Sequence, residues 1–335
     1  MRIATYNVEW FHALFDEHDH LLRDGEWSSR HSVTRAEQAD AVGHVFRAMD
    51  ADAVMVIEAP DTNGKNSVVR ALERFAGAYG LRTRAVVQGF ANDTKQEIAL
   101  MYDPDMLKVA HRPYPAQGEV PRFDGVFRID LDVDATKDDV RFSKPPLELA
   151  ATTLTGFEFR MIGVHLKSKA PHGAETEDEV QKIAIANRRK QLAQSIWLRA
   201  RVDQVLADGH PLMVLGDLND GPGLDVFEEL FGRSSVEIVL GTGRDGALYD
   251  PHAERALARR HTPVPTTARF WIEPEKRFLQ ALLDYVMLSA GLRGRRPVWR
   301  IWHPLDDPEC WSDATLRDAL VTASDHFPVT VDLEI

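Results

Sequence analysis

Pro211-Leu212-Met213-Val214-Leu215-Gly216 is an uninterrupted apolar run that passes directly into the polar turn Asp217-Leu218-Asn219-Asp220. The apolar run predicts a buried strand. Asp217 and Asn219 are two positions apart, so in an extended segment their side chains would project to the same side. A carboxylate beside an amide that can donate suits a phosphate or an attacking water, and an Asx-rich turn is the alternative interpretation.

Short strands dominate the rest of the chain, and helices are few and unevenly spaced. A capping box at Thr34–Glu37 begins one predicted helix, Ser67–Tyr79 forms another, and Glu177–Ala207 forms a long one that ends at Gly209-His210-Pro211. A short helix is expected around Leu224–Phe231. Besides a strand that begins at the second residue, strands are expected at Ala53–Ile57, Arg82–Gln88, Glu97–Tyr102, Val126–Val133, Leu147–Leu154, Phe157–Leu166, Leu282–Leu288, Val298–Trp302 and Pro328–Ile335. This pattern favours two packed sheets flanked by helices over strict βαβ alternation.

Composition restricts the classes of protein to consider. A chain of 335 residues with 44% hydrophobic and 27% charged residues is typical of a globular protein. No run approaches the roughly 18 apolar residues of a membrane span, and no leader precedes the first strand, so we expect a cytoplasmic protein. The only cysteine, Cys310, excludes an internal disulfide and a thiolate metal cluster. The sequence does not indicate an oligomeric state.

Polar side chains lie at the ends of several predicted strands. Strand periodicity places Asp284 on the face of Val286, His165 on the face of Met161, Glu58 on the face of Val54 and Val56, and Asn7 on the face of Ile3 and Thr5. A carboxylate among aliphatic neighbours needs a partner or a metal ion. Each of these residues alone is a weak indication, because an inward histidine is most often a hydrogen-bonded core residue.

An acid and a base, Asp325 and His326, are adjacent just before the final strand. Together with the other segments they make the chain resemble the endonuclease/exonuclease/phosphatase superfamily. The motifs that carry the resemblance, in order, are TYNVEW (5–10), VIEAP (56–60), GVHLKSK (163–169), VLGDLND (214–220), LDYVMLS (283–289) and SDHFPV (324–329). The resemblance implies a four-layer α/β sandwich, in which two mainly antiparallel sheets are flanked by helices, and a single domain over residues 1–335.

The resemblance also implies a metal site. Glu58 would be the main metal ligand, Asn7 would bind the metal shell or the phosphate, and Asp325 would complete the metal environment. These oxygen donors suit Mg²⁺ or Mn²⁺, with Ca²⁺ as an alternative.

The remaining roles follow from the same resemblance. His326 would act as general base on water or stabilise the pentacovalent phosphorus, and Asp284 would orient it. Asp217 and Asn219 would position the nucleophile and a non-bridging phosphate oxygen. His165 would hydrogen-bond the phosphate or assist the leaving group, with Glu97 as its candidate carboxylate partner and Gln96 as the competing one. Lys144 stands where many relatives have an arginine that clamps phosphate, so it would bind phosphate without the bidentate fork.

The sequence leaves the substrate open. A phosphodiesterase or nuclease, a phosphatase of small phosphomonoesters, and a non-catalytic binding module are the three hypotheses, and the last fits least because every motif position holds a competent residue. Basic runs at Arg293–His303 and Asn187–Lys190 suit nucleic acid, although a surface loop and a solvated helical face explain them as well. Net charge of −12, and an acidic segment Asp16–Asp19 in the polar stretch Phe11–Val33, predict a preference for small diesters over long duplex DNA.

Overall fold

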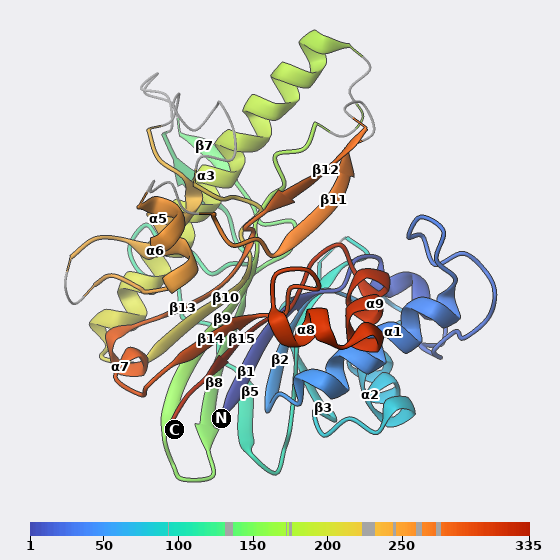
Figure 1. The fold of residues 1–335 in the computed structure, drawn as a ribbon. Helices are drawn as coiled ribbons and strands as arrows, with labels where there is room; N and C mark the ends of the chain where they lie inside the picture. The colour runs from blue at the N-terminus through green and yellow to red at the C-terminus, as the bar shows by residue number, and fades with distance from the viewer. Residues whose placement is uncertain are drawn as a thin grey trace.

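Two β-sheets form the centre of the molecule (Figure 1). The computed structural model of the chain describes residues 1–92, 94–130, 137–171, 173, 176–222, 232–243, 246–258, 263–272 and 276–335, so the helix expected around Leu224–Phe231 lies outside the described residues. The first sheet has the order β14 (Val298–Ile301), β15 (Val329–Asp332), β1 (Arg2–Asn7), β2 (Ala53–Ala59), β4 (Glu97–Tyr102), β3 (Ala85–Gln88). The second has the order β13 (Asp284–Leu288), β10 (Leu212–Asp217), β9 (Glu158–His165), β8 (Leu147–Thr153), β5 (Leu107–His111).

Both sheets are mainly antiparallel, as expected. Over the described ranges, each sheet contains one parallel pair: β1 with β2 in the first and β9 with β10 in the second. Because β1 runs parallel to β2, and β9 parallel to β10, the polar residues that follow these strands come out at one edge of each sheet. This edge carries the site described below.

Apolar side chains fill the space between the sheets and also cover their outer faces. Ile3 and Met55 of the first sheet meet Met161, Leu215 and Val286 of the second in one buried cluster. A second cluster joins the first sheet to η1 (Phe11–Leu14), α1 (Arg35–Met49), α2 (Val68–Tyr79), α8 (Pro308–Ser312) and α9 (Ala314–Ala323). A third joins the other sheet to α3 (Glu177–Ala207), α5 (Ser235–Leu240) and α6 (Pro251–Leu257). The predicted four-layer sandwich is therefore confirmed.

Helix ends follow the local signals in the sequence. Thr34 and Glu37 form the predicted capping box of α1, and Ser67 caps α2. The long helix α3 has the predicted bounds, and a second capping box, from Thr176 and Glu179, satisfies the first free N–H groups of the helix.

Several elements were not predicted. They are β5, β7 (Asp138–Val140), which pairs with β6 (Phe127–Ile129), the hairpin of β11 (Ala268–Ile272) and β12 (Arg277–Ala281), and the short helices η1, α5, α6, α7 (Ala290–Arg293), α8 and α9. The strand expected over Val126–Val133 is shorter, since β6 ends at Ile129 and residues 131–133 are outside the described part.

The acidic segment Asp16–Asp19 is held at the N-terminal end of α2, and none of its residues lines the pocket described below. Asp19 is 1% exposed, and its carboxylate accepts hydrogen bonds from Asn66 Nδ2 at 3.0 Å and from Ser67 N at 3.1 Å. An ion pair of 2.7 Å joins it to Arg70 of α2. The segment is therefore attached to the N-terminal end of α2, and its charge is partly neutralised there.

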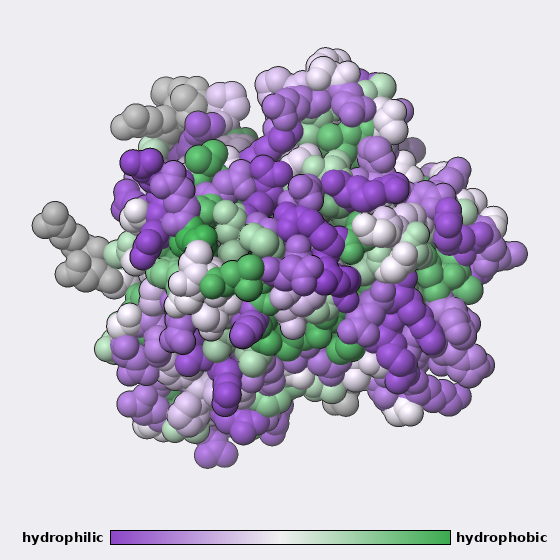
Figure 2. Space-filling model, turned by 90° about the horizontal axis from the view of Figure 1, so that it is seen from below, coloured by the Kyte–Doolittle hydropathy of each residue, from purple (hydrophilic) through white to green (hydrophobic). Residues whose placement is uncertain are grey.

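The basic run Arg293–His303 makes contacts within the chain, and its first part lies at the other end of the sheets. Arg293 lies over the ring of Tyr249 at 3.9 Å and Arg295 over Phe157 at 4.5 Å, while the Trp299 indole donates to Val286 O at 2.8 Å. Figure 1 places α7, where the run begins, near the end of the molecule that carries both termini. Viewed from that end, hydrophilic and hydrophobic residues are interspersed over the surface (Figure 2). Within the described ranges, none of the helices is long and apolar enough to cross a membrane.

Candidate active site

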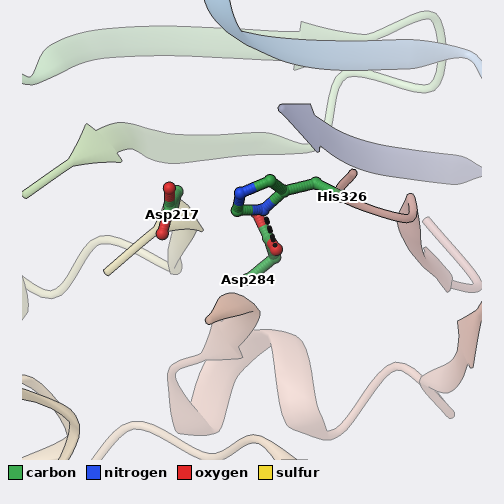
Figure 3. A group of neighbouring side chains, drawn as sticks. All are labelled: Asp217, Asp284 and His326. Atoms are coloured by element: carbon green, nitrogen blue, oxygen red, sulfur yellow. Dashed lines mark hydrogen bonds and ion pairs between the residues drawn. The ribbon is translucent and has the colours of Figure 1, made fainter. Parts of the chain in front are cut away.

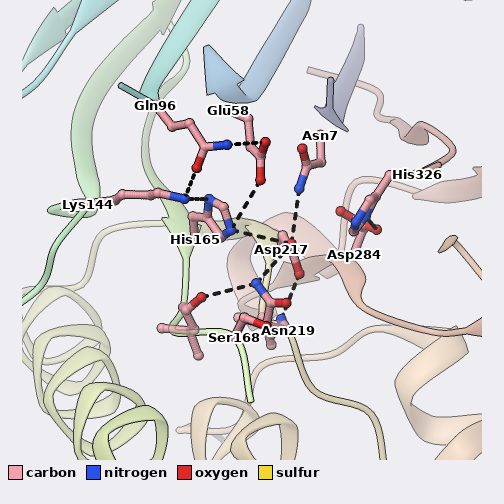
Figure 4. Close-up of polar contacts among 12 residues, drawn as sticks. Asn7, Glu58, Gln96, Lys144, His165, Ser168, Asp217, Asn219, Asp284 and His326 are labelled. Carbon is pink, nitrogen blue, oxygen red and sulfur yellow. Dashed lines mark hydrogen bonds and ion pairs between the residues drawn. The ribbon is translucent and has the colours of Figure 1, made fainter. Parts of the chain in front are cut away.

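A pocket of about 590 Å³ opens where the strands of the two sheets end, and it is large enough for a small ligand. Asn7 ends β1, His165 ends β9 and Asp217 ends β10, while Asp284 begins the antiparallel β13. Two or four positions further into each of these strands lies a residue of the cluster between the sheets, namely Ile3, Met161, Leu215 and Val286. Strand alternation therefore directs the four side chains toward the same inter-sheet space. The structure thus brings these four sequence-predicted residues together (Figure 4).

Glu58 reaches the pocket by a route that strand alternation does not predict. Val54 and Val56 pack toward the helices, so regular alternation would have turned Glu58 away from the other sheet. Instead the pairing of β2 with β4 shifts between Ile57 and Ala59, and Glu58 has a left-handed backbone with φ of 61°. A non-glycine residue in this region is uncommon, and backbone strain of this kind is enriched at functional sites. The bulge turns the carboxylate into the pocket that it lines.

His326 and Asp284 form a buried pair, with the imidazole between Asp284 and Asp217 (Figure 3). His326 Nδ1 lies 2.8 Å from Asp284 Oδ2. Burial alone would lower the pKa of His326, but the negative charges of Asp284, Asp217 and Asp325 outweigh it and raise that pKa well above 6.5. The pair therefore favours a protonated imidazole in the folded protein.

Asp217 is the centre of a hydrogen-bond network. Asn219 N donates to its Oδ1 at 2.7 Å, and the side-chain amides of Asn7 and Asn219 both donate to its Oδ2 at 3.1 Å. Burial, with the charge of Asp284 next in importance, raises the pKa of Asp217 to about 7. Asn219 has φ of 49°, so the segment is not extended here: the two side chains meet through an Asx turn, the alternative interpretation of this segment.

Lys144 and His165 line the opposite wall of the pocket. Lys144 Nζ lies 3.2 Å from His165 Nδ1 and also bonds to Gln96 Oε1, while the Gln96 amide donates to Glu58. Burial, reinforced by the charges of Lys144 and His326, lowers the pKa of His165 well below 6.5. Because Lys144 can only donate, a neutral His165 accepts at Nδ1 and carries its proton on Nε2. Nε2 faces Asp217 Oδ2 at 3.7 Å.

Glu97 is not the partner of His165, which corrects the sequence-based candidate. The side-chain amide of Asn92 donates to Glu97 Oε2 at 2.7 Å. The next residues of β4 explain the difference, because Ile98 packs between the sheets whereas Ala99 packs toward the helices. By alternation, Glu97 shares the helix-facing side, and Gln96, the competing candidate, shares the side of the pocket.

Two functional residues were missed in the sequence. Glu9 lines the pocket, and burial, then the nearby charge of Asp325, raises its pKa to about 7, although Arg30 opposes the shift. Ser324 ties the segment of Asp325 to β1, since its hydroxyl donates to Asn7 O at 2.8 Å and accepts from His326 N at 3.1 Å. Both residues lie inside the motifs quoted above, two residues after Asn7 and directly before Asp325, and that position was the available signal.

The oxygen atoms around Glu58 fit a hard cation. Asn7 Oδ1 and Asp325 Oδ1 are buried and, within the described residues, have no hydrogen-bond partner. Burial raises the pKa of Glu58, and the charge of Asp325 adds to that shift. A cation there would therefore bind the two unpaired oxygen atoms and also offset the repulsion between the two carboxylates. Asp217, Asp284 and His326 also offer ligand atoms within 4.8 Å of one another, but His326 Nδ1 is already bonded to Asp284 and its ring favours the protonated form.

Comparison with known proteins bears on the family and the fold. The model of the Endonuclease/Exonuclease/phosphatase family matches residues 4–326, while no curated protein matches the chain significantly. A truncated TDP2 of Caenorhabditis elegans is similar in structure with a TM-score of 0.51 and 14% identity, covering 98% of this chain and 96% of that one. An endonuclease/exonuclease/phosphatase family protein of Bacteroides thetaiotaomicron has a TM-score of 0.52 and 14% identity, covering 99% of this chain and 96% of that one. An AP endonuclease of Archaeoglobus fulgidus has a TM-score of 0.50 and 13% identity, covering the whole of both chains (100% each). The structures support the fold, and the family match spans nearly the whole sequence: the chain belongs to the endonuclease/exonuclease/phosphatase family, whose members are phosphoesterases and nucleases.

Proposed function

We propose that this chain is a divalent-metal-dependent phosphodiesterase that hydrolyses its substrate by in-line attack of water. One observation carries the proposal: His326, whose ring is held by the buried Asp284, and the oxygen donors Asn7, Glu58 and Asp325 line a single pocket. A phosphorus ester needs charge neutralised on its non-bridging oxygens and stabilisation of the pentacovalent phosphorus. A cation held by the oxygen donors and the protonated imidazole of His326 are suited to these two tasks.

Asp217 is assigned as the group that takes the proton from the attacking water. A carboxylate with a pKa of about 7 is matched to accepting a proton near neutral pH. The amides of Asn7 and Asn219, which hold its Oδ2, fix its orientation. Of the two roles expected for His326, its raised pKa supports stabilisation of the pentacovalent phosphorus as a cation, with Asp284 holding the ring in place.

Lys144 and His165 are assigned to the phosphate. His165 Nε2–H is a neutral donor that faces the pocket, and the ammonium of Lys144 fixes the tautomer through Nδ1. Asn219 would donate to a non-bridging oxygen once the substrate competes for its amide. The donors of Lys144 and His165 are in place before substrate arrives, which favours the transition state without reorganisation.

A Mg²⁺ or Mn²⁺ ion would be held by Glu58 and Asp325, with Asn7 beside them, and Glu9 is close enough to feel the charges of both carboxylates. When bound, the ion would neutralise charge on the phosphate. The set contains only oxygen donors, which is the chemistry that hard cations prefer.

A substrate panel tests the proposal. Bis-p-nitrophenyl phosphate, p-nitrophenyl phosphate, plasmid DNA and single-stranded RNA would each be offered with and without Mg²⁺ or Mn²⁺. We expect metal-dependent release of p-nitrophenol from the diester. Hydrolysis of the monoester alone would make the protein a phosphatase, and inactivity on all four substrates with either metal would refute the proposal.

A further inference from the structure

Gln194 of α3 fastens two loops to the same point of the helix. Its side chain is 2% exposed. Its Oε1 accepts a hydrogen bond from Lys167 N at 2.9 Å, and its Nε2 donates to Arg141 O at 3.3 Å. One turn earlier on α3, Gln191 Nε2 donates to Lys167 O at 2.9 Å. Lys190, adjacent to Gln191, therefore lies beside the loop that carries Lys167.

The hollow that contains the candidate active site continues past these cations. Lys144 and Lys167 line the pocket of about 590 Å³, and Arg141 and Lys190 line a neighbouring hollow of about 410 Å³. Thr94 and Ser143 line both, so the two spaces share a wall. A substrate that extends beyond the active site in this direction meets Arg141 and Lys190 next.

The carboxylates in this region are already neutralised by other residues. Asp124, which lines the second hollow, accepts two hydrogen bonds from Arg122, at 2.6 and 3.0 Å. Asp138 lies 3.5 Å from Arg189. By contrast, in the part of the chain that the structure describes, the side chains of Arg141, Lys167 and Lys190 make no ion pair with any carboxylate. Three unpaired cations beside an enzymatic pocket are unusual, because like charges in proximity repel.

We propose that Arg141, Lys167 and Lys190 form a subsite for a second phosphate group of the substrate, next to the phosphate that is cut. The assignment rests on the proposed function, since the active-site pocket defines where the first phosphate lies. The shared chemistry is a diester that carries a further phosphate, whether this is the next link of a nucleic-acid strand or a terminal phosphate of a small molecule. The expected solvated helical face at Arg188–Lys190 is thereby corrected: Arg188 is fully buried, and Lys190 is half-buried in the wall of the hollow.

The electrostatics of Lys167 agree with this assignment. Burial lowers the pKa of the Lys167 ammonium, and the charge of Lys190 lowers it further. Lys144 also feels the charge of Lys167. A bound phosphate would remove the repulsion between these ammonium groups and gain charge-assisted hydrogen bonds from them.

The test compares substrates that differ only in a second phosphate. Thymidine 5′- and 3′-(p-nitrophenyl phosphate) would each be assayed with and without a phosphate on the other hydroxyl. In the unmodified enzyme we expect the extra phosphate to raise kcat/KM about tenfold in at least one isomer. A factor of this size is at the lower end of what a hydrogen bond between charged groups contributes. Lys190→Gln and Arg141→Gln should abolish that preference through KM and leave the one-phosphate substrates unaffected. Lys182→Gln, an exposed cation two turns earlier on α3, is the matched control and should behave as the unmodified enzyme.

Two further arms separate the outcomes. A short single-stranded oligonucleotide identifies the source of the second phosphate. If the oligonucleotide is cleaved, and the slope of the logarithm of its affinity against the logarithm of salt concentration becomes shallower by about 0.7 in Lys190→Gln, the source is a strand. A tenfold preference without strand cleavage indicates a small bisphosphate. Calorimetric binding of thymidine 3′,5′-bisphosphate against the 5′-monophosphate reports on the subsite without catalysis. If no substrate is hydrolysed but the bisphosphate binds about tenfold tighter in a Lys190-dependent way, the proposed function fails and the subsite stands. A preference below twofold in both isomers, or one retained in both variants, overturns the subsite.

Discussion

Asp220→Asn should destabilise the protein more than any exposed charge substitution. Asp220 directly follows Asn219 and is completely buried. Its Oδ2 accepts hydrogen bonds from Arg188 Nη1 and from Ser235 N, each at 2.6 Å. Its Oδ1 accepts from Lys169 Nζ at 2.6 Å and from Gly221 N at 3.0 Å. An amide has one acceptor oxygen instead of two, so one of these two pairs of donors would face an NH₂ group.

The magnitude follows from the burial of Arg188. This guanidinium is also completely buried, and without the charge of Asp220 its main remaining side-chain acceptor is Gln191 Oε1 at 2.7 Å. Removing one partner of a buried ion pair costs about 3–5 kcal/mol, because the other charge is left uncompensated. A loss of this size is a large part of the stability of a typical domain, about 5–15 kcal/mol.

Urea unfolding followed by tryptophan fluorescence measures the effect, with Asp124→Asn as the control. Asp124 pairs with Arg122 at 2.6 Å, but both side chains are more than a third exposed, and such pairs contribute about 0–1 kcal/mol. The double variant Asp220→Leu with Arg188→Met should cost less than the two single substitutions added together, since the completely buried charge of Arg188 is removed together with that of Asp220. Additive costs, or an Asp220→Asn variant as stable as Asp124→Asn, would refute the reasoning.

Three other outcomes are expected. His326→Ala and Asp217→Asn should each lower turnover of bis-p-nitrophenyl phosphate by at least about 10²-fold with an unchanged circular dichroism spectrum, and near-normal turnover would show that the role was wrongly assigned. EDTA should abolish activity and Mg²⁺ or Mn²⁺ should restore it, so full activity in extensively chelated protein would contradict a metal-dependent mechanism. Burial lowers the pKa of His252 to about 4, so between pH 6.5 and 4 the unfolded chain binds a proton that the folded chain does not, and the stability that this group contributes is lost on acidification. His252→Gln removes that contribution, so in urea titrations at several pH values the free energy of unfolding of the unmodified protein should fall relative to that of the variant from pH 6.5 toward 4; a constant difference would contradict the shift.

Local signals determined how well the fold could be predicted. The bounds of α3 were predictable because a polar, acidic start and Gly209-His210-Pro211 mark its two ends. The hairpin of β11 and β12 carries the exposed aromatics Trp271 and Phe278, so it lacks the alternation of apolar and polar residues that identifies a half-buried strand. The short helices α8 and α9 depend on contacts of Cys310 and Leu320 with the first sheet's outer face, which no local pattern reveals.

The site could be predicted in its members but not in its contacts. Asn7, His165 and Asp217 end strands whose alternation is regular, so period two gave their direction correctly. Glu58 points into the pocket because of a β-bulge, and the aliphatic residues around it give no sequence signal for that bulge. Gln96 and Glu97 are adjacent, so which of them faces the pocket depends on the exact register of β4. A shift of one residue exchanges the two faces of a strand, and the sequence does not fix the register that closely.

Net charge is a poor guide to the substrate of this protein. Screening limits exposed charges to about 8–10 Å near physiological salt, so the pocket is governed by the groups around it and hardly by the total of −12. The segment Asp16–Asp19, on which the expected discrimination against long duplex DNA depended, is attached to α2, and its Asp19 is paired with Arg70. The cations Lys144, Lys167 and Lys190 lie along the path that a longer phosphate ester would take. The net negative charge of the molecule therefore opposes a polyanion at long range, whereas these cations attract it at the pocket. Added salt weakens the attraction of exposed cations most and that of half-buried cations least.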